Sequence, residues 1–225
     1  MSPEASKTVT IRGSLAGQSF AVTGYAFNST FYFGIAGAKA VPRRKVVDTA
    51  KCNSCHETLA LHGGGRRNAA EHCEMCHNPA AVDTPDPSRA AGFKVPAGTA
   101  PQSINFRFMP HRLHTGEELS RDFTIYRTRG VFNFNGVRYP GDRRDCAQCH
   151  VNKSNQVPLP EGLANALAPR EFYSPLGPTA SACLGCHDGV DAAAHTYLMT
   201  APFGESCPVC HEEGADFAVS KVHAR

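Results

Sequence analysis

Alternating apolar and polar positions near the start of the chain predict β-strands. The alternation and a high aromatic content extend over residues 8–33, with turns expected at Gly13, Gly24 and Asn28–Ser29. A few strands need another layer to pack on, so this segment is too short to be a stable β-domain by itself. The following residues, 34–45, predict an irregular linker.

Regular patterns are short and scattered in the rest of the chain. The proline-rich and glycine-rich stretch 79–102 predicts a loop without regular structure. A hairpin is expected over residues 131–139, around Asn135–Gly136, because this dipeptide accepts the positive φ angles of tight hairpin turns. These features predict a chain with much irregular backbone.

A short helix is expected within residues 103–116, because Gly116 is a typical residue just past a helix end. His111 and His114 are three positions apart in this segment, so a helix would place both imidazoles on one face. That spacing suits two metal ligands that serve two adjacent sites.

The composition indicates a small side-chain core. Of 225 residues, 41% are hydrophobic and 8% aromatic, with no Trp. The formal net charge of +3 and the scattered basic residues give little support for a nucleic-acid partner. No apolar run approaches the roughly 18 residues of a membrane-spanning helix. The first residues lack the pattern of a signal peptide, so an exported protein would need its export signal outside this chain.

All ten cysteines fall into five Cys-x-x-Cys pairs, and a histidine directly follows each pair. Cys-x-x-Cys-His is the attachment signature of c-type haem: the thiols add to the two vinyl groups, and the histidine becomes the proximal iron ligand. The predicted thioether cysteines are Cys52, Cys55, Cys73, Cys76, Cys146, Cys149, Cys183, Cys186, Cys207 and Cys210. The predicted proximal ligands are His56, His77, His150, His187 and His211. The predicted cofactors are therefore five haem c groups.

Zinc sites and structural disulfides are alternatives for the same cysteines. The intervals between the first and second pairs, and between the fourth and fifth, fit the spacing of four-cysteine zinc sites. Two such sites would leave Cys146 and Cys149 without partners. Neither zinc nor disulfides explain why a histidine follows every pair, so haem is preferred.

Six histidines remain for the distal side of five irons. Methionine is the rival distal ligand, but the chain has only four, of which Met1 is terminal and Met75 lies inside an attachment motif. Histidine on both sides of all five irons is therefore expected. The six candidates are His62, His72, His111, His114, His195 and His223.

Four stretches resemble a known family. They are Arg43–His56 with the first Cys-x-x-Cys-His motif, Leu59–Gly64, His72–Pro79 with the second motif, and Met109–Gly116 with its paired histidines. The sequence is similar to the haem domains of outer-membrane decahaem cytochromes of metal-reducing bacteria, the OmcA/MtrC family, over residues 43–225. By this resemblance the distal ligands are His62, His111, His114, His195 and His223, and His72 is not a ligand.

The resemblance also implies an architecture. Residues 1–46 would be a β-strand segment and linker, the end of a β-barrel domain. Residues 47–225 would be a pentahaem c-type cytochrome domain, mostly irregular, with short α-helices wrapped round stacked haems. The family carries ten haems in two such halves, whereas this chain has one pentahaem half.

Saturated irons exchange electrons but offer a substrate no coordination position, so we expect an electron-transfer protein without catalytic residues. The expected role is a conduit in extracellular electron transfer to metals or other terminal acceptors, with other redox proteins as partners. The expected location is the cell surface, the outer membrane or the extracellular space. One alternative is a multihaem reductase with one open haem. Another is a subunit of a polymeric cytochrome wire, completed by neighbouring copies.

Overall fold

The structure is a computed structural model, and it describes residues 8–25, 28–67, 70–85, 94–128 and 130–224. The chain divides into two compact units. The first contains Met1–Met75 and Ala147–Asn152, and the second contains Cys76–Cys146 and Lys153–Arg225. The chain therefore passes from one unit to the other inside the second attachment motif and again inside the third.

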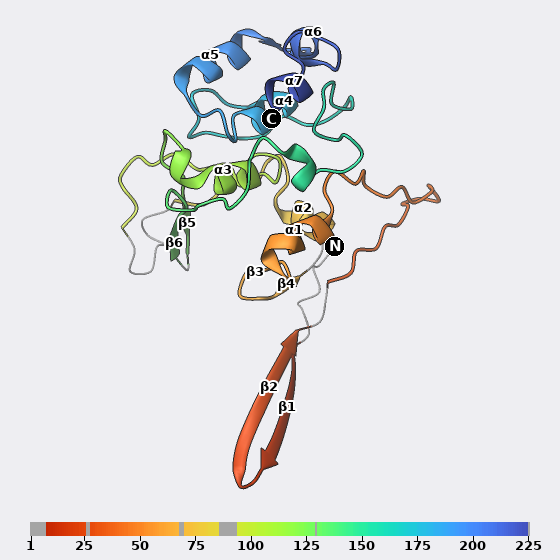
Figure 1. The fold of residues 1–225 in the computed structure, drawn as a ribbon, viewed down its shortest axis with the longest axis vertical. Coiled ribbons are helices and arrows are strands. Elements are labelled where there is room, and N and C mark those ends of the chain that lie inside the picture. Colours follow the sequence, from red (N-terminus) through yellow and green to blue (C-terminus); the bar gives the residue numbers. More distant parts are fainter. Residues whose placement is uncertain (1–7, 26–27, 68–69, 86–93, 129, 225) are drawn as a thin grey trace. The chain divides into compact units, whose positions relative to one another are not determined.

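The first unit consists of short elements joined by irregular chain (Figure 1). Its elements are β1 (Thr8–Leu15), β2 (Gln18–Tyr25), α1 (Thr49–His56), β3 (Ala60–Leu61), β4 (Arg66–Arg67) and α2 (Ala70–Cys76), whose last residue starts the second unit. Strand β1 pairs with β2 and β3 with β4, both antiparallel. The expected N-terminal β-segment is thus present as a single two-stranded hairpin.

The turn of the β1–β2 hairpin differs from the expected positions. It is formed by Ala16 and Gly17, with φ angles of 49° and 79°. Two consecutive residues with positive φ match the right-handed twist of a hairpin. Gly13 and Gly24 instead lie within the strands. The expected continuation of strand structure to residue 33 is also wrong, because the described residues after β2 are irregular there.

The second unit contains most of the helices. Its elements are α3 (Met109–Thr115), η1 (Gly116–Glu118), β5 (Thr124–Arg127), β6 (Gly130–Asn133), η2 (Cys146–Gln148), α4 (Pro178–Cys183), α5 (Val190–Leu198), β7 (Thr200–Ala201), β8 (Gly204–Glu205), α6 (Pro208–His211) and α7 (Val219–Val222). Only the first residue of η2 belongs to this unit. Strand β5 pairs with β6 and β7 with β8. No helix in the described part of the chain is both long enough and apolar enough to cross a membrane.

The hairpin expected over residues 131–139 is wrong. The observed hairpin joins β5 and β6, and Asn135–Gly136 forms a separate turn after β6, closed by a 3.1 Å bond from Val137 N to Phe134 O. The side chain of Asn135 explains the difference, since its Oδ1 accepts a hydrogen bond from Phe123 N at 3.0 Å. This contact holds Asn135 beside the start of β5 and outside the ladder.

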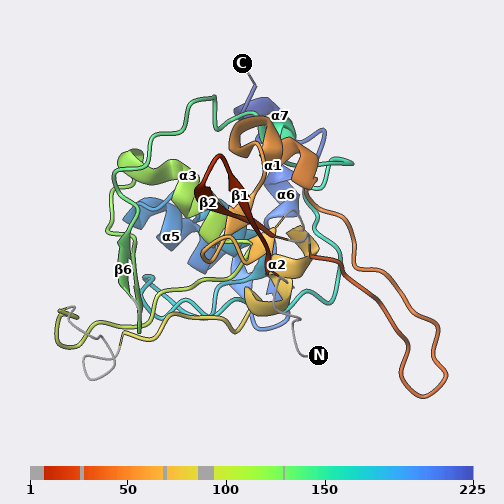
Figure 2. The ribbon, with the colours of Figure 1, turned by 90° about the horizontal axis from the view of Figure 1, so that it is seen from below.

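A small apolar core connects α3, α4 and α5. The expected helix end near Gly116 is correct, since α3 ends at Thr115 and Gly116 has a φ of 50°. Phe108, directly before α3, is fully buried and meets Phe123 edge-on, with ring centroids 6.3 Å apart. Ala193 of α5 belongs to the same cluster, and α5 and α3 overlap in the view from below (Figure 2). The buried cluster consists of Ile104, Phe108, Phe123, Ile125, Ala168, Leu176, Ala180, Leu184 and Ala193.

Candidate haem sites

The first attachment motif lies on α1. The Asp48 carboxylate caps this helix by accepting a hydrogen bond from Ala50 N at 3.0 Å, which satisfies one of the unpaired N–H groups of the first turn. Cys52 and Cys55 are three positions apart on the helix, so their thiols lie on the same side. The helix ends with His56, whose side chain is exposed.

The second motif has the same arrangement on α2. Cys73 and Cys76 are three positions apart on the helix, and His77 directly follows its end. The Nδ1 atom of His77 lies 2.7 Å from the carbonyl oxygen of Ile104, which fixes the orientation of the imidazole.

Part of the third motif belongs to the first unit and lies beside α1. His150 forms an isolated antiparallel bridge with Val47, and the carbonyl of Cys149 accepts a hydrogen bond from Asp48 N at 3.3 Å. The Lys51 ammonium also donates to the carbonyl of Ala147 at 2.6 Å. The residues just before the first motif and the end of the third are therefore neighbours within one unit.

The fourth motif begins at the end of α4. Glu205, on β8, accepts hydrogen bonds from the first N–H groups of α4, including Thr179 N at 2.7 Å. After the helix, the backbone N–H groups of Cys186 and His187 both donate to the carbonyl of Cys183, at 3.1 and 2.9 Å. This tight turn holds the two thiols and the histidine in one compact segment.

The fifth motif surrounds α6. Cys207 directly precedes the helix, and Pro208 occupies its first position, where the missing N–H costs nothing. Cys210 and His211 lie on the helix. The Nδ1 atom of His211 is 2.8 Å from the carbonyl oxygen of Phe217.

Five of the predicted iron ligands share one ring contact. In each, Nδ1 lies 2.7 to 3.0 Å from a backbone carbonyl oxygen. A carbonyl only accepts, so Nδ1 carries the hydrogen and the lone pair lies on Nε2, the tautomer that binds a metal through Nε2. The five are His77, His111, His114, His211 and His223.

Two predicted proximal ligands each face a predicted distal ligand. The ring centroids of His187 and His223 are 6.1 Å apart, and those of His195 and His211 are also 6.1 Å apart. A metal–imidazole bond of about 2 Å, plus about 1 Å from the nitrogen to the ring centre, places two ligands of one iron about 6 Å apart. The centroid separation in both pairs agrees with that of two imidazoles on one iron.

Burial favours the neutral form of several of these imidazoles. It lowers the pKa of His77, of His111 and of His187, and the neighbouring His223 ring lowers that of His187 further. A histidine must be neutral to bind a metal, so this environment suits ligation.

The remaining candidates lie in different surroundings. His111 and His114 are on α3, as expected, and the ring of His114 meets Tyr139 edge-on at 5.5 Å. His62 is exposed in the turn between β3 and β4, with a φ of 54°. His72 is buried on α2, and neither of its ring nitrogens has a hydrogen-bond partner. Burial, together with the charge of Arg66, lowers the pKa of His72.

The ten cysteines are not brought together into larger groups in the described part of the chain. No disulfide joins any of the ten cysteines. Among the described residues, His, Cys, Asp and Glu side chains form no group of three or more arranged to hold a metal ion. The cysteine pairs are instead carried on separate helices and turns, each with its own histidine.

Comparison with known proteins identifies the family. The family model for outer membrane cytochrome MtrC/MtrF-like domains II/IV matches residues 44–224. The chain belongs to this family. The MtrC/MtrF-like domain is also similar to the multiheme cytochrome MtrC of Shewanella baltica (strain OS185), with 26% identity over 176 residues. The alignment covers 78% of this chain and 19% of the relative, so the chain spans about a fifth of the length of that protein. No solved structure gives a significant match.

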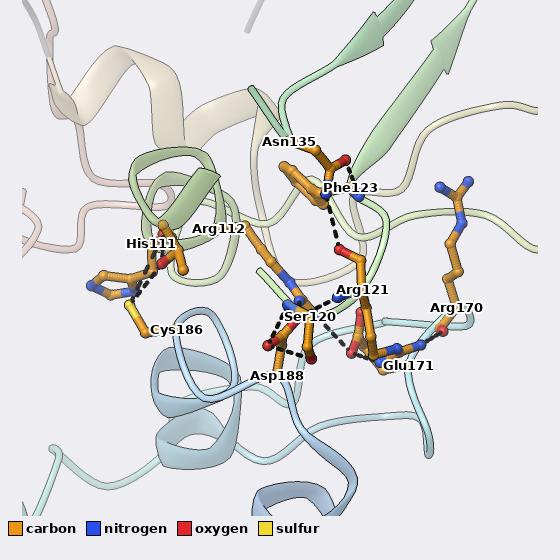
Figure 3. Close-up of polar contacts among 11 residues, drawn as sticks. His111, Arg112, Ser120, Arg121, Phe123, Asn135, Arg170, Glu171, Cys186 and Asp188 are labelled. Carbon is orange, nitrogen blue, oxygen red and sulfur yellow. Dashed lines mark hydrogen bonds and ion pairs between the residues drawn. The ribbon is translucent and has the colours of Figure 1, made fainter. Parts of the chain in front are cut away.

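The second unit of this MtrC/MtrF-like domain also contains a buried ionic cluster that is not among the sequence predictions (Figure 3). Arg112, on α3, is 1% exposed; its Nη1 lies 3.0 Å from Asp188 Oδ2 and its Nη2 lies 2.7 Å from Glu171 Oε2. Arg121 Nη1 binds the same Glu171 oxygen at 2.6 Å. Asp188 also accepts from Ser120 N, Ser120 Oγ and Arg121 N, at 3.1, 2.9 and 2.8 Å.

This cluster compensates its own charges. Burial alone would raise the pKa of the Asp188 carboxyl, but hydrogen bonds from Ser120 and Arg121, with the charge of Arg112, lower it below its ordinary value. Arginine is rarely fully buried, so neither composition nor spacing indicates that Arg112 is inside. One feature of the sequence could have indicated the cluster. Arg112 lies between His111 and His114, and Asp188 directly follows His187.

Proposed function

We propose that this chain holds five c-type haems with histidine on both sides of each iron and transfers electrons between redox partners. The observation that carries the proposal is the spacing of the two histidine pairs, His187 with His223 and His195 with His211, at 6.1 Å. Each pair joins the histidine of an attachment motif to one distant in sequence. The membership in a family of outer membrane cytochromes supports the same role.

The proposed residues of the haem sites are those expected from the sequence. The thioether bonds are assigned to Cys52, Cys55, Cys73, Cys76, Cys146, Cys149, Cys183, Cys186, Cys207 and Cys210. The proximal ligands are His56, His77, His150, His187 and His211. The distal ligands are His62, His111, His114, His195 and His223.

Exposed apolar side chains support a fold in which the chain wraps its haems. Leu198, Phe203, Val209 and Phe217 are all exposed, and they lie near His195 and His211 in the sequence. Exposed apolar groups concentrated in one segment indicate a surface that something covers. A porphyrin between the His195–His211 pair would cover them. In this proposal residues 47–225 form the haem domain, preceded by the β-segment and linker of residues 1–46.

When bound, each haem supplies a one-electron couple between ferric and ferrous iron. The protein's contribution is to supply imidazoles on both sides of each iron, which leaves no coordination position for a substrate. We therefore propose electron transfer without bond formation to the acceptor, in an exported protein at the outer membrane or cell surface. Its proposed partners are other cytochromes and terminal acceptors such as metal species.

The test is the mature protein, produced with an export signal and the haem-attachment machinery. A pyridine haemochrome assay combined with intact mass is expected to give five haems per chain, and the ferric protein is expected to show only low-spin electron paramagnetic resonance signals. A smaller haem number would contradict the five-site assignment. A high-spin ferric signal in the resting protein would instead indicate an open iron and favour a multihaem reductase.

A further inference from the structure

Helix α3, which carries the paired histidines, packs along its length against the fourth attachment motif. The closest approach is at Gly185, where the Cβ of an added side chain would lie 2.5 Å from the Cβ of His111. One turn further along α3, Thr115 Oγ1 lies 3.2 Å from the sulfur of Cys186. Between these contacts, Arg112 meets Asp188. Three successive points of α3 thus contact the segment 185–188.

We infer that Arg112 and Asp188 are positioning residues, which hold α3 against the fourth motif and set the redox potential of the haem held by His187. This inference rests on the proposed function, because it requires a haem at that motif. Neither side chain is a ligand. They act on this haem through the backbone beside His187 and through the balance of their charges.

Charge balance is the part of the inference that geometry makes testable. The cluster contains two guanidinium groups, of Arg112 and Arg121, and two carboxylates, of Glu171 and Asp188, so its net charge is zero. Three of these side chains are at most 6% exposed, and Arg121 is 27% exposed. In such a site an uncompensated charge is poorly screened by water and salt.

Two single variants therefore predict opposite effects. Arg112→Gln leaves Asp188 uncompensated beside His187, and a negative charge favours ferric iron, so the potential of one haem falls. Asp188→Asn leaves Arg112 uncompensated, and the same potential rises. Each shift is expected to be on the order of tenfold in the ferric-to-ferrous equilibrium, about 59 mV for a one-electron couple. The double variant restores neutrality and returns the potential toward that of the unmodified protein.

The measurement is a potentiometric titration of the five-haem protein, followed by electron paramagnetic resonance so that individual low-spin signals are separated. The matched control is Arg138→Gln, which removes a guanidinium from an exposed ion pair with Glu117 in the same unit. Its side chain is 83% exposed, so this substitution is expected to leave all five potentials unchanged. Haem number by mass verifies that each variant has matured.

Shifts of the potential in the same direction for Arg112→Gln and Asp188→Asn would overturn the inference. Such shifts would indicate loosened packing, because the effect of packing does not depend on which charge is removed. Unchanged potentials in both would overturn it as well. If Arg112→Gln fails to mature, Arg121→Gln removes a charge from the same cluster at a partly exposed position and must lower the same potential. If the unmodified protein shows no low-spin signals or no reversible redox couple, the proposed function itself is contradicted.

Discussion

Replacement of His223 by alanine tests the assignment of one iron to His187 and His223. His223 follows α7, and its Nδ1 contacts the carbonyl of Val219 at 3.0 Å, so alanine removes one ring contact at the end of a short helix. The substitution is therefore local. The ring-centroid separation of 6.1 Å agrees with the spacing of about 6 Å expected for two imidazoles on one metal.

The expected size of the spectroscopic change follows from the loss of a ligand at one iron in five. In the ferric His223→Ala protein, about one fifth of the low-spin signal is replaced by a high-spin signal, and the ferrous protein binds one carbon monoxide per chain. The potential of that haem rises, because a strong imidazole donor to the iron is lost. Added imidazole is expected to restore the low-spin signal. Intact mass must still show five haems, which separates loss of a ligand from loss of a haem.

A companion variant tests whether His195 and His223 ligate two different irons. His195→Ala opens the iron assigned to His211, so the double variant His195→Ala/His223→Ala is expected to bind two carbon monoxide molecules. One carbon monoxide in the double variant, or none in His223→Ala, would mean that at least one of the two 6.1 Å pairs is a ring contact without a shared iron. The reasoning from ring separation would then be refuted.

Two further predictions use other features of the chain. Gly185→Ala places a Cβ 2.5 Å from that of His111 and is expected to destabilise the holoprotein by about 1–3 kcal/mol. Gly189→Ala, with open space around its Cβ, is the matched control in thermal unfolding. Equal Tm values for the two variants would contradict the close packing at Gly185. Each ferric haem with ionised propionates adds about −1 and each ferrous haem about −2, which brings the chain from +3 to about −2 or about −7. Isoelectric focusing of the holoprotein is expected to give an acidic value, and a basic one would contradict the proposed haem content.

The sequence predicted those features that depend on spacing alone. In α1 and α2, the Cys-x-x-Cys spacing places both thiols on one side of a short helix. The interval between His111 and His114 likewise requires only one helical turn, and α3 provides it. The first strands were predictable because their alternation is local, although the turn at Ala16–Gly17 was placed wrongly.

Features that depend on distant contacts were not predictable. His187 precedes α5 in the sequence and His223 follows α7, yet their rings lie close together. Nothing in either segment specifies the other. Burial of Arg112 requires carboxylates from Glu171 and Asp188, both more than fifty residues away. The hairpin was placed wrongly because Asn135 binds Phe123 with its side chain rather than serving as a hairpin turn.

His72 shows why a count of histidines does not assign ligands, and it leads to a last prediction. It is 6% exposed, and neither ring nitrogen has a hydrogen-bond partner. A buried polar group without a partner costs about 1–3 kcal/mol, so His72→Leu is expected to leave the free energy of unfolding unchanged or to raise it by up to that amount. The folded pKa of His72 lies below its ordinary 6.5, so the unfolded chain takes up this proton first as the pH falls. The leucine variant should therefore lose less stability in acid.

The spin state separates this spare histidine from a ligand. Because the resemblance to the decahaem cytochromes assigns a distal role to His62 and none to His72, His72→Leu is expected to leave all five haems low-spin. His62→Leu, the matched control in the same unit, is expected to open one iron and give a high-spin signal. A high-spin signal in His72→Leu together with a fully low-spin His62→Leu would exchange the two roles. The five-haem chain would remain, with its buried histidine on an iron rather than beside one.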